Sequence, residues 1–400
     1  MSEPGQLIPV PGVSIATACA GVKTTTRDDL AMVVFGPETV MAGVYTQSAF
    51  AAPPVHVAKA RQGQARAWIV NSGNANAATG QPGREDAEAV CAAVANACGL
   101  DQNQVQPFST GVIGERLNVP KLCDTVASMA AQVRPDGWLA FSKAIMTTDT
   151  VPKAVSKHVT LDGEEIIITG VAKGSGMIKP NMATMLGYIA CNAVVSNVAL
   201  EQMVVAVANA SFNRITVDGD TSTNDCFMLA ATGQSQMTSI SGPEDERFAQ
   251  LQNAVLEVAQ TLAQAIVRDG EGATKFVTIT VSGGLSEHEC AEVGYTVAES
   301  PLVKTALFAG DANWGRFCMA IGRAEVDELD ETKVSLWLDD VQVAENGMMS
   351  EAYTEAAGAA VLAQDEFHVR IDLGRGDAEQ TIWTTDLSYE YVRINAEYRS

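Results

Sequence analysis

The sequence lacks the features of secreted, membrane-spanning and metal-binding proteins. No stretch approaches the roughly eighteen apolar residues that a membrane span needs, so we expect no transmembrane helix. The first residues, MSEPGQLIPVPG, have no basic start and no apolar centre, so we expect no secretory signal and a cytoplasmic protein. The four histidines lie far apart and none of the eight cysteines forms a C-x-x-C pair, which argues against a metal site and for free thiols in a reducing compartment.

Basic residues are also scarce. The chain has 26 Lys and Arg against 48 Asp and Glu, which gives a formal net charge of −22. A negative field of this size repels nucleic acid and anionic membrane surfaces, so we expect neither as a partner, and we attribute the charge mainly to solubility. Hydrophobic residues make up 47% of the 400 positions, which is enough for a sizeable core.

Helical and strand-like segments alternate along the chain, which predicts an α/β fold. The spacing of apolar residues predicts helices over residues 85–98, 119–132, 137–146, 197–213, 243–268 and 350–364. Short apolar or alternating runs predict strands over residues 67–70, 164–171, 185–191, 226–231, 276–281, 334–338, 366–373 and 380–384. The pattern of predicted helices and strands changes after residue 281. We therefore expect a catalytic core over residues 1–282 and a C-terminal lobe over residues 283–400.

The segment KGSGMIKPNMATML, residues 173–186, contains the residues that self-cleavage requires. Its glycines permit unusual backbone angles, and Pro180 restricts the residue before it. Thr184 follows the small Ala183, so its hydroxyl could attack the Ala183 carbonyl in an N-to-O acyl shift. Cleavage would leave Thr184 with a free α-amine of pKa about 7.7–8.0, which could serve as base for its own hydroxyl. An ordinary Gly-rich loop is the alternative.

A second candidate is the pair Thr110 and Gly111. In a tight turn, such a pair could aim a hydroxyl and a backbone N–H at one oxyanion, as acyl transfer requires, although an ordinary β-turn would have the same sequence. Acidic side chains that could coordinate a metal lie in the polar clusters TTDT at residues 147–150, DGDTSTND at residues 218–225 and RDGEG at residues 268–272, but residues 218–225 lack the glycine and terminal glutamate placement of a calcium loop. We therefore expect solvated turns there, and no metal.

A series of motifs along the chain resembles the ornithine acetyltransferase family, also called glutamate N-acetyltransferase, of arginine biosynthesis. They are GVKTTTRDDLAMVV, NSGNANAATG, STGVIGERL, AIMTTDT, KGSGMIKPNMATML, DGDTSTND, RDGEGATKF, VKTALFAGDANWGR and YVRINAEYRS. The resemblance runs almost from end to end. It implies a two-sheet αββα sandwich related to the self-processing aminopeptidases, followed by a C-terminal α+β lobe.

The resemblance also implies the site residues. It places the family's cleavage motif on Ala183 and Thr184, which gives an α chain of residues 1–183 and a β chain of residues 184–400. It makes Thr184 the nucleophile and assigns Thr110 and Gly111 to the oxyanion hole. The implied substrate-binding residues are Thr147, Lys173, Thr184, Glu271, Asn395 and Ser400. Thr148 is an alternative to Thr147, and Ser400 stands where relatives often have Thr.

The implied reaction passes an acetyl group from N2-acetylornithine to Thr184 and then to glutamate, a ping-pong step of the cyclic arginine pathway. Lys173 would pair with a substrate carboxylate, and Glu271 with the ornithine ammonium. The resemblance implies no cofactor. Acetyl-CoA is a candidate second donor because some family members accept it. The implied assembly contains two α and two β chains.

Two other functions fit the same residues. An N-terminal-nucleophile amidase or aminopeptidase would use Thr184 in the same way but would hand its acyl group to water. A binding protein would keep the fold and stay uncut. Glutamate-dependent release of ornithine separates the transferase from the amidase, and a denaturing gel separates both enzymes from the binding protein.

Overall fold

The computed structural model of the chain describes residues 5–22, 25–179 and 185–397. The chain forms two compact units, each of which draws on several segments. The first unit comprises Met1–Gly174, Lys179–Asn213 and Thr221–Ile266. The second unit comprises Ser175–Ile178, Arg214–Asp220 and Val267–Ser400. The boundary expected at residue 283 falls inside β10 (Phe276–Gly284), whose partner strands all belong to the second unit, so that unit begins earlier.

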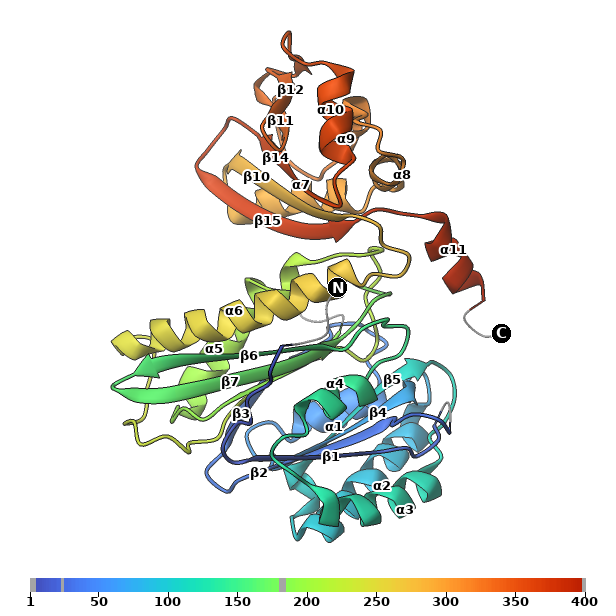
Figure 1. The fold of residues 1–400 in the computed structure, drawn as a ribbon, viewed down its shortest axis with the longest axis vertical. Coiled ribbons are helices and arrows are strands. Elements are labelled where there is room, and N and C mark those ends of the chain that lie inside the picture. Colours follow the sequence, from blue (N-terminus) through green and yellow to red (C-terminus); the bar gives the residue numbers. More distant parts are fainter. Residues whose placement is uncertain (1–4, 23–24, 180–184, 398–400) are drawn as a thin grey trace. The chain divides into compact units, whose positions relative to one another are not determined.

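The first unit has four layers, which confirms the expected αββα sandwich (Figure 1). Helices α2 (Gly80–Cys98) and α3 (Val119–Met129) cover one sheet, and α5 (Asn197–Asn209) and α6 (Glu246–Arg268) cover the other. The first sheet has the order β1-β2-β4-β5, with bounds Val13–Ala18, Leu30–Phe35, Ala67–Asn74 and Val105–Val112. The second has the order β3-β9-β8-β7-β6, with bounds Val40–Tyr45, Cys226–Ala231, Leu186–Cys191, Glu164–Lys173 and Lys153–Leu161.

An aromatic cluster fills the space between the two sheets. Tyr188 of β8 has its ring centroid 5.2 Å from that of Trp68 in β4 and 5.4 Å from that of Phe108 in β5. Phe141 lies 5.2 Å away on α4 (Trp138–Ala144), and α1 (Pro53–Ala60) adds its own apolar face to the same core. Burying each large apolar side chain stabilises the fold by roughly 1.5–3 kcal/mol, so this cluster holds the two sheets together.

Local signals explain where several helices begin and end. Gly99 ends α2 with a φ of +68°, the left-handed conformation that glycine adopts without strain. Ser196 begins α5, because its side chain accepts a hydrogen bond of 3.2 Å from the N–H of Ala199.

The cysteines differ in exposure. Cys91, Cys191, Cys226 and Cys290 are buried free thiols, as expected, and Cys19 lies at the surface.

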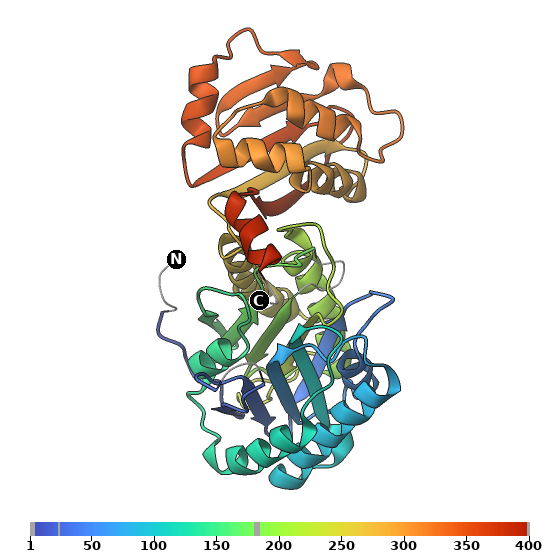
Figure 2. The same cartoon turned by 90° about the vertical axis from the view of Figure 1, so that its right-hand side faces the viewer.

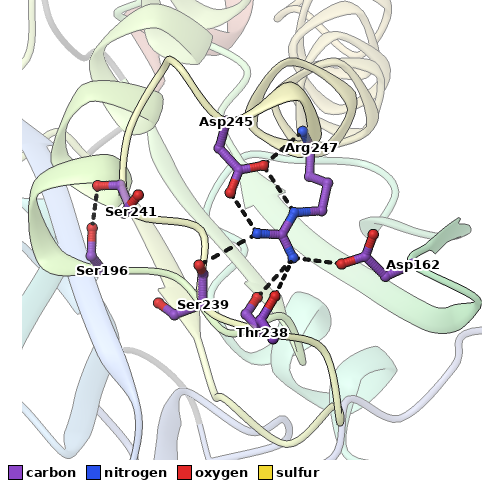
Figure 3. Close-up of polar contacts among 7 residues, drawn as sticks. All are labelled: Asp162, Ser196, Thr238, Ser239, Ser241, Asp245 and Arg247. Atoms are coloured by element: carbon purple, nitrogen blue, oxygen red, sulfur yellow. Dashed lines mark hydrogen bonds and ion pairs between the residues drawn. The ribbon is translucent and has the colours of Figure 1, made fainter.

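Arg247 fixes the start of α6. Its guanidinium donates to both carboxylate oxygens of Asp245, at 2.8 and 2.5 Å, and to Asp162 at 2.5 Å (Figure 3). The same group also reaches the side chain of Thr238 and the carbonyl of Ser239, in the loop before the helix. One side chain therefore ties the turn between β6 and β7 to the first turn of α6.

The second unit is a six-stranded sheet with helices on one face (Figure 2). Its strand order is β13-β12-β11-β14-β10-β15, with bounds Met348–Met349, Val341–Glu345, Ser335–Leu338, Glu366–Asp372, Phe276–Gly284 and Ala378–Thr385. The helices that share its core are α7 (Glu287–Ala298), α8 (Pro301–Ala309), α9 (Trp314–Gly322) and α10 (Glu355–Leu362). Helix α11 (Tyr389–Ala396) follows β15 and buries none of its residues. Every helix within the described residues is too short or too polar to cross a bilayer.

Candidate active site

Thr110 and Gly111 lie near the end of β5, not in the turn that their sequence suggested. β5 runs parallel to β4, and Gly111 is the partner of Gly73 at a point where the register shifts. Gly111 has a φ of +130°, and a Cβ there would lie only 2.3 Å from the carbonyl carbon of Gly73. Only glycine fits this close approach, so the backbone at Thr110 and Gly111 is fixed by strand pairing.

Buried amide side chains hold this strand end from both sides. Ser109 donates to the Asn71 side chain at 2.6 Å, and Asn71 in turn donates to the carbonyl of Asn74 at 2.8 Å. The amide of Asn224 donates to the carbonyls of Ser109, at 2.9 Å, and Ala75, at 2.6 Å. No role was predicted for Asn71 or Asn224, although Asn71 begins the motif NSGNANAATG and Asn224 lies in DGDTSTND.

Lys173 reaches the same point from the other sheet. It is the last residue of β7, and its Nζ donates to Thr110 Oγ1 at 3.2 Å. In the register of the second sheet, Lys173 is the partner of Leu186, the first residue of β8. Leu186 is also the partner of Cys226 at the start of β9. The structure thus brings three predicted site residues, Thr110, Gly111 and Lys173, together.

The predicted nucleophile cannot be placed in the same way. Ala183, Thr184 and Ser400 lie outside the described residues. The next residue along the chain, Met185, is buried, and its carbonyl accepts a hydrogen bond of 3.0 Å from the N–H of Cys226. The described chain therefore resumes at the end of the sheet where Lys173 lies.

Thr147 is tied to this end of the sheet through Asp149. The Asp149 carboxylate accepts the N–H of Thr147 at 3.0 Å, the N–H of Gly174 at 2.8 Å and the Nζ of Lys153 at 2.7 Å. Burial acts to raise the pKa of Asp149, but the charges of Lys153 and Lys173 and the hydrogen bonds outweigh it and hold the pKa well below its usual range. Asp149 is therefore ionised, and it accepts hydrogen bonds only.

A second buried carboxyl, Asp225, has the opposite character. Burial raises its pKa well above the usual range, and Ser222 and the charge of Lys173 lower it only in part. Its Oδ2 atom has no hydrogen-bond partner among the described residues. The prediction of solvated turns was wrong for Asp149 in the cluster TTDT and for Asp225 in the cluster DGDTSTND, because tertiary packing covers both side chains.

Two predicted substrate-binding residues, Glu271 and Asn395, lie together in the second unit. Asn395, on the exposed helix α11, donates from its side chain to Glu271 Oε2 at 2.8 Å. Glu271 is buried rather than solvated, and its N–H donates to the carbonyl of Ser175 at 2.8 Å. A Cβ on Gly176 would lie 2.4 Å from the Glu271 carboxyl carbon, so a larger residue there would displace it. Glu271 and Asn395 are thus adjacent, within hydrogen-bonding distance.

The acidic turn DGDTSTND contributes an anchor to the second unit. Both oxygens of Asp218 accept backbone N–H groups, from Met177 at 2.7 Å and from Ile178 at 2.8 Å. Tyr391 on α11 also donates its hydroxyl to Asp218, at 3.1 Å. Asp218 thus connects the segment after Lys173 with the helix that carries Asn395. Among the described residues, no group of His, Cys, Asp and Glu side chains could hold a metal ion.

Comparison with known proteins identifies the family. The family model described as "ArgJ family" matches residues 14–400. This chain belongs to the ArgJ family. The arginine biosynthesis bifunctional protein ArgJ of Pseudomonas fluorescens is 52% identical over 98% of each chain. The protein of the same name from Psychrobacter arcticus is 49% identical over 100% of this chain and 99% of its own.

The fold is also similar to that of a solved ArgJ structure. It is the crystal structure of the arginine biosynthesis bifunctional protein ArgJ from Bacillus halodurans, which is 35% identical to this chain. The match covers 54% of this chain and 100% of that one, with a TM-score of 0.52. The resemblance expected from the sequence motifs, to the ornithine acetyltransferase family of arginine biosynthesis, is therefore confirmed by the match to the ArgJ family in sequence and fold.

Proposed function

We propose that this protein transfers an acetyl group from N2-acetylornithine to glutamate in arginine biosynthesis, after cutting its own chain between Ala183 and Thr184. Membership of the ArgJ family over residues 14–400 carries the proposal. The contact of 3.2 Å between Lys173 Nζ and Thr110 Oγ1 supports it, because it gathers residues for acyl transfer where the chain resumes after Thr184.

Self-cleavage requires one bond to form and one to break. The hydroxyl oxygen of Thr184 attacks the carbonyl carbon of Ala183, the peptide C–N bond breaks, and the proton moves to the nitrogen that becomes the α-amine. Water then hydrolyses the resulting ester, which frees the hydroxyl. Residues 1–183 and 184–400 are now separate chains, and Thr184 has both a nucleophile and a base.

Acetyl transfer reuses the same two groups. The hydroxyl of Thr184 attacks the acetyl carbonyl of N2-acetylornithine, and its own α-amine takes the proton and delivers it to the departing ornithine nitrogen. The amino group of glutamate then attacks the acetyl ester and restores the hydroxyl. In each half-reaction, the Thr110 hydroxyl and the Gly111 N–H stabilise the oxyanion, and the neighbouring Lys173 ammonium adds positive charge.

The substrate contacts follow from charge. Lys173 pairs with a substrate carboxylate, and Glu271 pairs with the side-chain ammonium of ornithine. Asn395 orients Glu271 through the hydrogen bond of 2.8 Å that joins them. Thr147 and Ser400 complete the set. We further propose that the protein uses acetyl-CoA as a second donor, needs no cofactor, assembles from two α and two β chains, and works in the cytoplasm.

A denaturing gel tests the cleavage step. Wild type should run as two fragments, and the second should begin at Thr184 by N-terminal sequencing. Thr184→Ala should run as one full-length band, whereas Thr261→Ala, an exposed threonine on α6, should be cut like wild type. Identical gels for wild type and Thr184→Ala would overturn the mechanism.

The transfer step needs an assay of its own. Purified protein is mixed with N2-acetylornithine, with and without glutamate, and the products are measured. A transferase releases at most one ornithine per active site without glutamate, turns over repeatedly only when glutamate is present, and then forms N-acetylglutamate in step with the further ornithine. Release of acetate that does not depend on glutamate would identify an amidase instead. Acetyl-CoA with glutamate, in the same assay, tests the second donor.

A further inference from the structure

A buried ion pair lies beside the predicted site and belongs to none of its assigned residues. Asp149 follows α4 and precedes β6, and Lys153 is the first residue of β6. Their side chains are 0% and 1% exposed, and Lys153 Nζ lies 2.7 Å from Asp149 Oδ1. In the second sheet, Lys153 is the partner of Ala172, the residue before Lys173. The pair is thus built into the end of the strand that carries Lys173.

Asp149 joins the two segments on which the predicted site depends. Its Oδ1 atom accepts the N–H of Gly174, directly after Lys173, and its Oδ2 atom accepts the N–H of Thr147. Hydrogen bonds to a carboxylate are stronger and shorter than those between neutral groups. One side chain therefore fixes the backbone at Thr147 and the backbone at the exit of β7.

Stability alone does not account for this arrangement. Two charges lose their hydration when they are buried, and an apolar pair of similar volume often gives a protein of equal or greater stability. What an apolar pair cannot supply is an acceptor for the two backbone N–H groups. The ion pair therefore serves to fix the backbone at Thr147 and Gly174 rather than to add stability.

We propose that Asp149 is a positioning residue for acetyl transfer, which holds Thr147 in place and sets the Lys173 ammonium against the Thr110 hydroxyl. Lys153 balances the charge of Asp149 inside the protein. This inference rests on the proposed function, since it concerns the same site. The low pKa of Asp149 agrees with it, because a carboxylate that stays ionised keeps accepting both N–H groups across the range of an enzyme assay.

The test removes the ion pair without leaving a lone buried charge. In Asp149→Ala/Lys153→Met both charges are lost together, so no lone charge is buried and the fold should survive, with a melting temperature lowered by the loss of the acceptor for the N–H groups of Thr147 and Gly174. We expect kcat for glutamate-dependent ornithine release to fall about 100-fold, because misplacing groups by about 1 Å can slow a reaction by that factor. The control is Arg61→Met/Glu88→Gln, which removes another ion pair of the same unit, with a buried Arg61 and a partly exposed Glu88, and should keep wild-type kcat.

A double-mutant cycle with Lys173→Met shows whether Asp149 acts through Lys173. If it does, removing the pair from a Lys173→Met protein should slow the reaction by clearly less than 100-fold, since one of the two groups it positions is already gone and only Thr147 remains to be misplaced. A merely structural role predicts that the two losses multiply. Multiplying losses, or an unchanged kcat in the pair-removed protein, would overturn the inference.

Two further measurements keep the test decisive. If the pair-removed protein does not fold, Asp149→Asn takes its place in the same cycle, because the amide keeps the shape but only one of the two acceptors. Wild type is assayed in parallel. No glutamate-dependent release by wild type would refute the proposed function itself, whereas active wild type with an equally active Asp149 variant would refute only the positioning role.

Discussion

Lys304 should make the stability of the protein rise with pH in the alkaline range. It lies on α8, is 3% exposed, and donates from Nζ to Thr384 Oγ1 at 3.3 Å and to the carbonyl of Thr385. Burial lowers the pKa of its ammonium from 10.5 to about 8, although Asp386, Asp218 and Glu299 partly offset the effect. The buried amine thus releases its proton more readily in the folded protein than in the unfolded chain.

The sign and size of the effect follow from this difference. Below pH 8 both states hold the proton, so the unfavourable burial of the charge is fully present. Between pH 8 and 10.5 the folded state releases the proton while the unfolded chain keeps it, so the free energy of unfolding rises with pH. At about 1.4 kcal/mol per pKa unit, the drop from 10.5 to about 8 corresponds to about 3 kcal/mol.

Urea unfolding at several pH values from 7 to 11 measures the effect. The background is Thr184→Ala, so that an uncut chain unfolds as one molecule. The stability difference between this protein and its Lys304→Met derivative should grow by about 3 kcal/mol between pH 7 and 11. Subtraction removes the contribution of buried thiols and phenols, which titrate in the same range. Lys333→Met, at an exposed lysine of the same unit, is the control and should give a flat difference. A flat difference for Lys304→Met as well would refute the reasoning.

Three further predictions concern the site and the core. Thr110→Val keeps the side-chain shape but removes a hydroxyl, so kcat for ornithine release should fall about 10²–10³-fold, and an unchanged kcat would exclude Thr110 from the oxyanion hole. Glu271→Gln removes the charge that we propose pairs with ornithine, so the KM for N2-acetylornithine should rise about 10- to 100-fold while the KM for glutamate stays within a few-fold, and equal changes in both would contradict that pairing. Phe141→Ala removes a fully buried ring that contacts Tyr188, so thermal unfolding should show a loss of about 3–5 kcal/mol, and a much smaller loss would mean that the core repacks.

Elements with strong local signals could be predicted from the sequence. Residues 226–231 are six buried residues in a row between polar turns, and β9 has those bounds. Helix α2 begins at Gly80 rather than at the expected residue 85. The earlier start was missed because the first turn contains Pro82. Proline usually ends a helix pattern, yet the first turn tolerates it, since its missing N–H would have no partner there.

Features set by contacts distant in sequence could not be predicted. Strand pairing with β4 makes Gly111 part of β5, although a Thr-Gly pair favours a turn. The contact between Lys173 and Thr110 joins residues from two different sheets, and no local pattern records it. Likewise, nothing near Asp149 or Asp225 in the sequence distinguishes a buried acidic residue from a solvated one, because neighbours far along the chain cover both.

The order of strands in the second sheet predicts how the two fragments of the proposed cleavage would stay together. Strands β3, β6 and β7 precede the proposed cleavage site between Ala183 and Thr184, and β8 and β9 follow it. Because the order is β3-β9-β8-β7-β6, the two strands of the C-terminal fragment lie between strands of the N-terminal fragment. β9 pairs with β3 on one side, and β8 pairs with β7 on the other. Separating the two fragments would break the hydrogen bonds of both strand pairs at once. The cleaved protein should therefore unfold in a single transition and migrate as one species on a native gel.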